Sequence, residues 1–378
     1  MRRLIRNSAD RSGAIAHFPE SEQMNTPRQE IPHGLEAPVL VVVPCLNEEK
    51  HIEGVITGLL AEADRINLRI IVADGGSTDR TRATIQRLAD ADHRIVPMDN
   101  FRRIQAAAVN AAVRKHGNGA EFLIRVDAHA GYPARYCEQL LNVQARTRAD
   151  SVVVTMRTEG CTCFERAAAA AQNSILGHGG AAHRGEAACR WVDHGHHALM
   201  TIDAFMTVGG YDESFSHNED AELDARLTAA GFHIYLTGET QVTYYPRGSA
   251  IALFRQYFNI GRGRAHNFLK HRKNAKLRHL ILAGVAPVLC LYVLTPLSSV
   301  FAIPVLVWVL LCLGYGLVLG FRQRDLCAAA AGIAAIAMQA GWSFGFFAGL
   351  KTGFSRIAAT KSADGAGREI PKRNRIAR

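Results

Sequence analysis

Two long stretches without a charged residue near the C-terminus constrain this chain more than any other feature. Residues 280–321 contain no charged side chain, and residues 326–350 contain none either. About 20 consecutive apolar residues are enough for a helix to cross the hydrocarbon core of a bilayer. The sequence therefore predicts a membrane domain over residues 280–350, built from two or three hydrophobic segments.

The number of membrane spans depends on the second of these stretches. Residues 280–300 and 301–321 predict two spans, after which the charged residues 322–325 would face the cytoplasm, because basic flanks mark that side of a membrane. If residues 328–350 also span, the basic tail 351–378 lies outside, against this rule. If they lie in the interface or re-enter, the tail stays inside. Glycines recur there at a spacing that suits close helix packing, namely Gly341, Gly345 and Gly349.

Basic residues gather beside the apolar stretches, in a chain with a net charge of +10. No acidic residue interrupts the group that precedes the first stretch, which consists of Arg262, Arg264, Lys270, Arg272, Lys273, Lys276 and Arg278. Such a group attracts anionic lipid head groups and marks a membrane surface. Nucleic acid is the rival partner for positive charge, but no nucleic-acid-binding module is visible, so we expect none.

The N-terminal residues 1–36 are polar and lack the apolar core of a secretory signal. We therefore expect a disordered lead-in and a soluble domain that stays in the cytoplasm. The eight Cys residues are scattered and fit reduced, structural thiols. Cys161 and Cys163 are close enough to bind a metal together, but no second close pair follows them, and two buried thiols are the favoured interpretation.

Residues 37–250 alternate short apolar runs with amphipathic stretches, which predicts an α/β domain with a largely parallel sheet covered by helices on both faces. The expected strands are residues 39–43, 70–73, 95–96, 122–126 and 151–155, and the expected helices are 48–62, 79–88, 103–115 and 133–145. The less regular second half predicts helices over 166–176, 203–208 and 219–230 and strands over 234–236 and 241–244. Residues 251–279 form a basic juxtamembrane segment, in which 253–270 predict an amphipathic helix on the membrane surface.

Polar residues follow the first two expected strands, at the sheet edge where ligands of such folds bind. The first strand ends at Pro44, and Asn47-Glu48-Glu49 then opens a helix. The second ends at Asp74, before Gly75-Gly76, whose small size lets a ligand approach the backbone. Glu48 would lie beside a nucleoside, and Asp74 would accept the imide N–H of a uracil ring. Ordinary capped turns, with Ser77 or Thr78 capping the next helix, are the structural alternative.

Two further motifs supply groups for chemistry. Asp127 and His129 follow the fourth strand at a spacing that lets both face one ligand, and they would hold Mg²⁺ or Mn²⁺ against a diphosphate. Asp220 begins the helix 219–230, where the helix dipole favours a carboxylate in any case. In the functional interpretation Asp220 takes the proton from an attacking sugar hydroxyl.

Arg262 and Arg264 lie between the α/β domain and the membrane part. Arginine suits diphosphate oxygens because its planar fork donates paired hydrogen bonds. A basic cluster on the membrane surface is the alternative, and the two roles are compatible.

Taken in order, these motifs resemble those of family 2 glycosyltransferases over residues 36–270. The residues that carry the resemblance are Pro44, Asn47-Glu48-Glu49, residues 74–79, Asp127 with His129, residues 209–213 and Glu219-Asp220. Within that family the chain is similar to the ExoA-type subfamily of succinoglycan biosynthesis, on the stretches 172–174, 193–197 and 216–220. The resemblance implies a GT-A, Rossmann-like fold.

The resemblance also implies roles for single residues. Glu48 and Asp74 would contact uridine, Asp127 the ribose and donor diphosphate, and His129 would complete the metal site. Asp220 would be the catalytic base. Arg262 or Arg264 would clamp the diphosphate near the acceptor. Gln105 and Asn110 lie in a helix that in this family often faces the donor.

The activity implied is inverting transfer of a sugar, with UDP-glucose as the donor, to an undecaprenyl-diphosphate-linked acceptor at the bacterial inner membrane, beside other polysaccharide assembly proteins. The chain departs from the family in having Asp-x-His where Asp-x-Asp is usual. It also lacks the Gln/Arg-x-x-Arg-Trp motif of processive synthases, which argues for one sugar per acceptor.

Other functions remain as alternatives. A non-catalytic nucleotide-sugar-binding scaffold could lose Asp127, His129 and Asp220 without penalty, so their presence argues against it. A nucleotidyltransferase would need a triphosphate-gripping loop after the first strand, and residues 44–50 do not form one. His194, His196 and His197 lack the helical spacing of a zinc protease site, and we expect them to line the acceptor cleft or hydrogen-bond the loop.

Overall fold

The computed structural model describes residues 35–179, 189–271 and 277–366, with the backbone alone described for His178 and for residues 354–366. Most of the expected lead-in 1–36 lies outside these residues, as does the end of the basic tail. Residues 33–378 form one compact unit. The domain boundaries expected at residues 250, 279 and 350 therefore stay a prediction.

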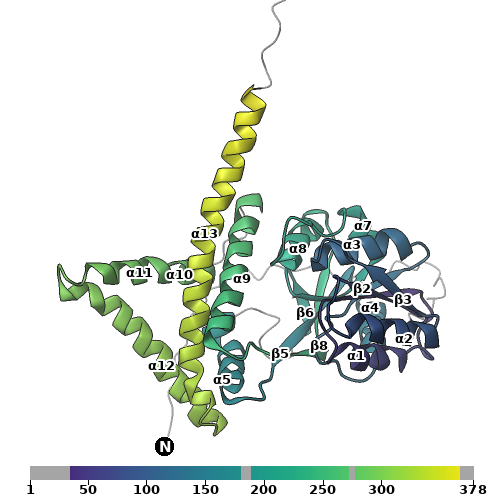
Figure 1. Ribbon diagram of the computed structural model, residues 1–378, viewed down its shortest axis with the longest axis horizontal. Helices are drawn as coiled ribbons and strands as arrows, with labels where there is room; N and C mark the ends of the chain where they lie inside the picture. The colour runs from purple at the N-terminus through teal and green to yellow at the C-terminus, as the bar shows by residue number, and fades with distance from the viewer. Residues whose placement is uncertain (1–34, 180–188, 272–276, 367–378) are drawn as a thin grey trace, which may run out of the picture. The chain divides into compact units, whose positions relative to one another are not determined.

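A mixed sheet lies at the centre of the α/β domain (Figure 1). Within the described residues it has eight strands, in the order β3-β2-β1-β4-β7-β5-β8-β6. The strands are β1 (Val39–Cys45), β2 (Leu68–Asp74), β3 (Ile95–Asp99), β4 (Phe122–Arg125), β5 (Ser151–Thr158), β6 (Arg190–Val192), β7 (His196–Thr201) and β8 (Ile234–Tyr244). The β1–β4 half is parallel throughout, and its register sets Cys45 opposite Asp74 and Val42 opposite Arg125. Three of the motifs found in the sequence therefore meet at one edge of the sheet.

The expectation of a largely parallel sheet holds only for this half. Strand β7 runs antiparallel between β4 and β5, and β6 runs antiparallel to β8 at the edge. Sequence analysis missed β7 because the strand starts at His196-His197, which are polar residues at buried or half-buried positions. The two strands expected over 234–236 and 241–244 are the single strand β8, which carries a register shift against β5 after Val154.

Both faces of the sheet are covered by helices. The helices of the α/β domain are α1 (Ile52–Leu60), α2 (Thr81–Ala91), α3 (Gln105–His116), α4 (Tyr136–Thr147), α5 (Cys163–Gln172), α6 (Ile175–His178), α7 (Ile202–Thr207) and α8 (Glu219–Ala229). Val41 and Val43 of β1 pack into one apolar cluster, whereas Leu40 and Val42 pack into the other. Alternate β1 residues thus bury against opposite helix layers, which explains why the strand reads as a continuous apolar run.

Among the residues that the structure describes, three helical stretches are long and apolar enough to cross a membrane: Leu277–Leu294, Ser299–Gln323 and Ala328–Gly353. The first stretch comprises α10 (Leu277–Ala283), α11 (Val285–Leu291) and η2 (Tyr292–Leu294). The second comprises η3 (Ser299–Ala302) and α12 (Ile303–Gln323). The third comprises η4 (Ala328–Ala330) and the start of α13 (Ala331–Ala366). The boundary between the first two falls before Ser299. By length and composition, the stretch left open by the sequence is thus a third candidate span.

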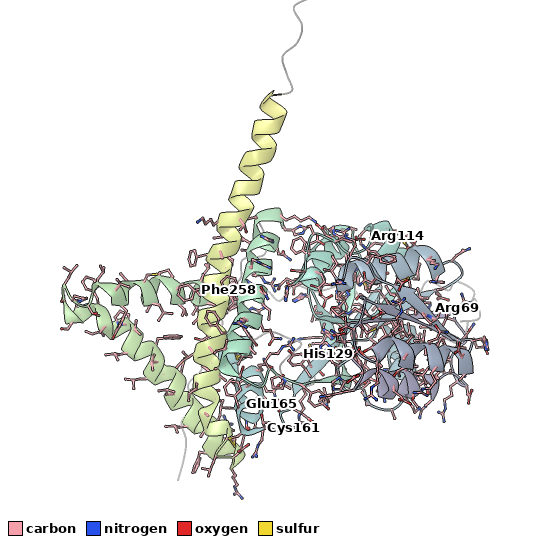
Figure 2. The ribbon with its side chains drawn as sticks, in the orientation of Figure 1. Arg69, Arg114, His129, Cys161, Glu165 and Phe258 are labelled. Carbon is pink, nitrogen blue, oxygen red and sulfur yellow. A yellow bond between two sulfur atoms is a disulfide. The ribbon has the colours of Figure 1, made fainter. Side chains whose placement is uncertain are left out.

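Helix α9 (Ala250–His271) packs along α13 (Figure 1). The glycine spacing expected to permit close helix packing serves this contact: a Cβ added at Gly341 would lie 2.5 Å from the carbonyl oxygen of Phe254. A Cβ at Gly345 would meet the carbonyl oxygen of Phe258 on α9, which Figure 2 labels. The close packing is therefore confirmed, and α9 is fixed to α13 over its length.

We expect Gly345→Ala to destabilise the protein by about 1–3 kcal/mol, because the added methyl group meets backbone that cannot move aside. Gly314→Ala on α12 is the matched control, since a Cβ at Gly314 meets nothing within 4 Å. The control should stay within about 1 kcal/mol of the wild type. The midpoint of thermal unfolding in detergent measures both. Equal midpoints for the two variants would contradict the close contact between α9 and α13.

Candidate active site

The loops after β1 and β2 are joined by hydrogen bonds. The Asn47 side-chain oxygen accepts from the Thr78 backbone N–H at 2.8 Å, and the Asn47 N–H donates to Ser77 Oγ at 2.8 Å. The Glu48 N–H donates to Thr81 Oγ1 at 2.7 Å. Asn47 adopts a left-handed conformation with φ of 56°, which asparagine tolerates better than most residues. These bonds fix the position of Glu48 at the sheet edge.

Asp74 is occupied by its own loop. One carboxylate oxygen accepts from Ser77 Oγ at 2.5 Å and from the Ser77 backbone N–H at 3.1 Å. Ser77, expected as a helix cap, therefore binds Asp74 instead. Asp79 accepts from the Thr81 N–H at the start of α2. Asp74 lines a small hollow beside Arg82, separate from the cavity that holds Pro44 and Glu48.

Two cavities meet at the carboxyl end of β4. The smaller, which we call the sheet-edge cavity, has a volume of about 250 Å³ and is lined by Pro44, Glu48, Gly75, Arg103 and neighbouring residues. The larger, which we call the helix-side cavity, has about 500 Å³ and extends from Asp220 to α9, α10 and α13. Both are lined by Gln105, Asp127 and His129. The expected metal-binding residues thus lie at the junction of the two cavities.

Hydrogen bonds orient the two expected metal ligands. Gln105 Nε2 donates to Asp127 Oδ1 at 2.8 Å, and His129 Nδ1 lies 3.0 Å from Glu48 Oε1. Because an ionised carboxylate can only accept, His129 Nδ1 donates, and the other ring nitrogen of a neutral imidazole keeps its lone pair. This is the arrangement in which a histidine binds a metal through Nε2. Burial alone would raise the pKa of Asp127, but the charges of Arg125, His196 and His129 together lower it below its ordinary value.

Asp220 forms a forked salt bridge with a buried arginine. Arg125, which is 4% exposed, donates from its two terminal nitrogens to the two Asp220 oxygens at 2.6 and 3.1 Å. The Tyr211 hydroxyl donates to Asp220 Oδ1 at 3.0 Å. Burial alone would raise the pKa of Asp220, but the Arg125 charge holds it well below its usual range. Asp220 is therefore ionised and fixed in orientation.

Asn110 supports this arrangement from a distance. Its side chain donates to the Tyr211 carbonyl at 2.8 Å and accepts from the Tyr211 N–H at 2.9 Å. Asn110 is buried and lines neither cavity, so the structure gives it a role in holding Tyr211. Gln105, one turn earlier on α3, does face the site.

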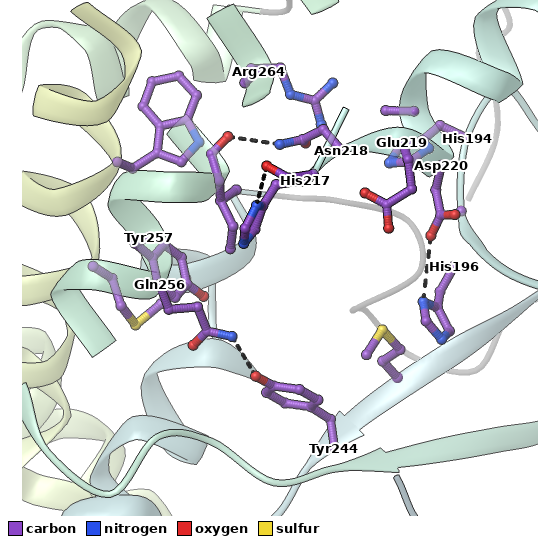
Figure 3. A pocket seen from close by; sticks show the side chains of 18 of the residues that line it. His194, His196, His217, Asn218, Glu219, Asp220, Tyr244, Gln256, Tyr257 and Arg264 are labelled. Atoms are coloured by element: carbon purple, nitrogen blue, oxygen red, sulfur yellow. Dashed lines mark hydrogen bonds and ion pairs between the residues drawn. The ribbon is translucent and has the colours of Figure 1, made fainter. Parts of the chain in front are cut away.

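Glu219 lines the helix-side cavity next to Asp220 (Figure 3). Burial, followed by the charge of Asp220, raises the pKa of Glu219 to about 7. The two neighbouring carboxyl groups therefore differ in protonation near neutral pH. Asp220 is an anion, whereas Glu219 exchanges its proton.

The three histidines after β6 have different roles. His194 Nδ1 and His197 Nε2 lie 2.6 and 2.7 Å from the two oxygens of the buried Asp224, so they fix the loop. His196 lies between the two carboxylates, 3.8 Å from Asp127 and 3.9 Å from Asp220. Burial and the Arg125 charge lower the pKa of His196 to about 4, so the ring is neutral. His194 and His196 thus line the helix-side cavity, whereas His197 is buried behind its wall.

The two expected arginines of α9 are placed differently. Arg264 lines the helix-side cavity, whereas Arg262 does not. Arg262 acts on His217 instead: burial is the main cause that lowers the pKa of His217, and the Arg262 charge is the next. In the part of the chain that the structure describes, no group of three or more His, Cys, Asp or Glu side chains is arranged around a common metal position.

Sequence reasoning missed two arginines of the site. Arg125 had a signal, since a charged residue within the apolar run of β4 needs a buried partner. Arg103 had none, because its position depends on how loops far apart in sequence meet. His196 was expected to line the acceptor cleft, and Glu219 belongs to a motif that carries the family resemblance, although no chemical role was expected for it.

One expectation about cysteines is wrong. Cys163 forms a disulfide with Cys327, which lies 164 residues away, and Cys161 is exposed. The bond joins the start of α5 to the loop before η4, where Arg166 also pairs with Asp325 at 2.6 Å. Sequence spacing gave no sign of a pairing across so many residues.

The fold and the site have known counterparts. The family model described as glycosyl transferase family 2 matches residues 40–199. The chain is 50% identical over 319 residues to succinoglycan biosynthesis protein ExoA of Rhizobium meliloti (strain 1021), an alignment that covers 84% of this chain and 97% of the relative.

Among solved structures, the mannosyltransferase PcManGT from Pyrobaculum calidifontis, in complex with GDP-Man and Mn²⁺, matches with a TM-score of 0.52 and 19% identity, covering 84% of this chain and 91% of that chain. S. aureus TarS matches with a TM-score of 0.41 and 12% identity, covering 64% of this chain and 41% of that chain.

The mixed sheet, with a carboxylate site at the end of its parallel half, is the GT-A fold of nucleotide-sugar-dependent transferases. The chain belongs to glycosyl transferase family 2, and it is a glycosyltransferase.

The raised pKa of Glu219 predicts a pH dependence of stability that one substitution removes. The ordinary value is 4.5 and the folded value about 7, so between them the folded chain binds more protons than the unfolded chain. The stability that Glu219 contributes is therefore present below pH 4.5 and is lost as the pH rises through about 7.

Unfolding midpoints at pH values on either side of this window check the expectation. The midpoint should fall less in Glu219→Gln than in the wild type, whereas Glu121→Gln, at an exposed glutamate, should follow the wild type. An equal fall in all three proteins would show that Glu219 titrates alike in both states.

Proposed function

We propose that this chain transfers one glucosyl group from UDP-glucose, with inversion, to an undecaprenyl-diphosphate-linked sugar during the synthesis of a succinoglycan-like exopolysaccharide. The observation that carries the proposal is the placement of Asp220. This carboxylate lies in a cavity that begins at Asp127 and His129 and ends at candidate membrane helices. The 50% identity to a succinoglycan biosynthesis protein supports the choice of pathway.

The donor nucleotide would occupy the sheet-edge cavity. Pro44 and Glu48 line it, and Gly75 leaves room for a ligand near the backbone. Asp74, now bound to Ser77, would meet uracil only by giving up part of that hydrogen bonding. Gln105 and Asp127 would lie beside the ribose and the diphosphate, at the passage into the helix-side cavity.

Asp127 and His129 would hold Mg²⁺ or Mn²⁺. A carboxylate oxygen and an imidazole nitrogen with a free lone pair are competent ligands for these ions. The bond from His129 to Glu48 leaves that lone pair available, which is the feature of this chain that fits a metal. When bound, the ion would neutralise charge on the departing diphosphate.

The chain's own groups would carry the rest of the reaction. The acceptor hydroxyl loses its proton to Asp220 as its oxygen bonds to the anomeric carbon, and the bond to the UDP oxygen breaks with its electron pair. Arg125 and Tyr211 hold Asp220 so that one oxygen edge stays in a fixed place. The low pKa of Asp220 means that proton transfer comes late, once bonding has made the hydroxyl acidic.

The proposed location is the bacterial inner membrane, with the catalytic domain in the cytoplasm. Three apolar helices of sufficient length support attachment to a membrane. A disulfide between Cys163 and Cys327 is uncommon in a reducing compartment.

The proposed cytoplasmic location therefore predicts that this bond, which the structure contains, is absent in cells and that both cysteines are thiols there. Acid-quenched alkylation followed by mass spectrometry should find both modified, and a disulfide-linked peptide pair would place this face outside the cytoplasm.

The transferase prediction concerns UDP release. With Mg²⁺ or Mn²⁺ present, the purified protein should release UDP from UDP-glucose only when a lipid-diphosphate-linked sugar is added. Asp220→Asn should lower the rate by about 10² to 10⁴, because the base is lost. Glu219→Gln should lower it less if Asp220 is the proton acceptor.

Donor panels complete this test. Turnover with another UDP-sugar would correct the donor and keep the reaction class. UDP binding without turnover under any pairing, unchanged in Asp220→Asn, would favour a nucleotide-sugar-binding scaffold instead.

The metal prediction uses binding rather than turnover. Calorimetry should show that Mn²⁺ strengthens UDP binding to the wild type and that Asp127→Asn removes most of this gain. His51→Ala, which changes a residue bonded to Glu48 on the far side from His129, is the control. A gain that survives in Asp127→Asn would place the metal elsewhere.

A further inference from the structure

Among the residues that the structure describes, two arginines at the α10 end of the helix-side cavity form no ion pair, and the charge of Asp193 acts on Arg278 only from further away. Arg264 comes from α9 and Arg278 from α10, and both line the cavity, as does His279. Within residues 35–179, 189–271 and 277–353, no carboxylate lies within ion-pair distance of either guanidinium, and neither makes a side-chain hydrogen bond. Figure 3 shows Arg264 among the lining side chains, with Glu219 and Asp220 in the same cavity.

Two such cations at one place are costly without a counter-ion. Burial, and then the charge of Arg278, lowers the pKa of Arg264 to about 10. Asp224, the acid that acts on Arg264 from further away, already binds His194 and His197. A buried charge that is not paired in the protein is stabilised when an anion enters beside it. The cavity is therefore prepared for a negatively charged ligand at this end.

We propose that Arg264 and Arg278 bind the diphosphate of the lipid-linked acceptor, so that its sugar reaches Asp220 through the same cavity. The inference rests on the proposed function and assigns the acceptor subsite within it. The sequence predicted that Arg264 would clamp a diphosphate near the acceptor. In this proposal Arg264 binds the diphosphate of the acceptor itself. Arg262, the other candidate, does not line the cavity.

The donor diphosphate has a different place. The sheet-edge cavity has its own arginine, Arg103, and neither Arg264 nor Arg278 lines it. The two cavities share Gln105, Asp127 and His129, where the reacting ends of donor and acceptor would meet. Each cavity thus supplies a cation for one diphosphate.

The surroundings of Arg278 indicate a lipid rather than a soluble anion. Arg278 is the second residue of the candidate span Leu277–Leu294, and Leu282 of the same span lines the cavity. Met338 and Trp342 of the third candidate span line it as well. An anion bound by the arginines would therefore have apolar side chains beside it. An isoprenoid chain attached to that anion could pack against them on its way to the bilayer.

The number of arginines fits a diphosphate. A guanidinium donates paired hydrogen bonds to phosphate oxygens, and two guanidinium groups match two linked phosphates. The volume of about 500 Å³ lies in the range of ordinary ligand sites and leaves room for a sugar beside the diphosphate. A phospholipid head group with one phosphate is the competing occupant.

Binding of farnesyl diphosphate to the full-length protein tests this assignment without requiring turnover. In zwitterionic nanodiscs, farnesyl diphosphate should bind the wild type more tightly than farnesyl monophosphate does. Arg264→Gln and Arg278→Gln should each weaken its binding on the order of tenfold or more, because a charged, bidentate partner is lost. Arg255→Gln, at an exposed arginine of the same helix, should bind as the wild type does.

UDP binding with Mn²⁺ serves as the folding control and should be unchanged in all three variants. Equal binding of farnesyl diphosphate by the wild type and both cavity variants, or no binding to the wild type, would overturn the proposal. The proposal would also be overturned if phosphatidylglycerol added to the nanodiscs displaced farnesyl diphosphate, because the arginines would then bind a phospholipid. Failure of sugar transfer with intact farnesyl diphosphate binding would instead contradict the proposed function alone.

Discussion

The buried pair of Arg125 and Asp220 is the interaction on which the rest of the site depends. A guanidinium at the end of a central strand loses its hydration, and only nearby carboxylates offset that cost. Asp220 comes from α8, so α8 must dock against β4 before the charge is satisfied. Tyr211 and Asn110 then connect α3 to the same carboxylate through three hydrogen bonds. The Arg125–Asp220 pair thus couples β4, in the parallel half of the sheet, to α8, which follows the antiparallel strand β7 in the chain.

The site also depends on the contact between α9 and α13. The helix-side cavity has one wall in the α/β domain and another made by Gln256, Tyr257 and Arg264 of α9. Glycines of α13 let the backbone of α9 approach closely, and the Cys163–Cys327 disulfide joins α5 to the start of the last helical segment. The cavity is therefore a property of both parts of the chain, which gives a physical reason for the α/β domain and the candidate membrane helices to lie in one polypeptide.

Sequence patterns predicted the elements better than their arrangement. The β-branched runs, the strand-end motifs and the uncharged stretches each follow from local rules of burial, and the structure places strands, loops and helices there. Strand β7 was missed because His197, which is 1% exposed, is buried by pairing with Asp224 rather than by being apolar. Asn110 was given the role of a donor-facing residue, since local rules cannot show that Tyr211, 101 residues away, is its partner. Ser77 was given the role of a helix cap, although its partner Asp74 is only three residues away. Contacts between distant segments thus decided the differences at β7 and Asn110, whereas the difference at Ser77 is local.

The Asp-x-His departure from the family pattern is explained by Glu48. A carboxylate at position 129 would lie beside Glu48, and two anions at that distance would repel each other. A histidine turns the same neighbour into a hydrogen-bond acceptor, which fixes the tautomer and raises the basicity of the ring nitrogen that is left to bind a metal. In the proposed metal site, the Glu48 carboxylate would lie behind His129 rather than bind the ion itself. Glu48 would then serve both the proposed nucleoside contact and the orientation of His129.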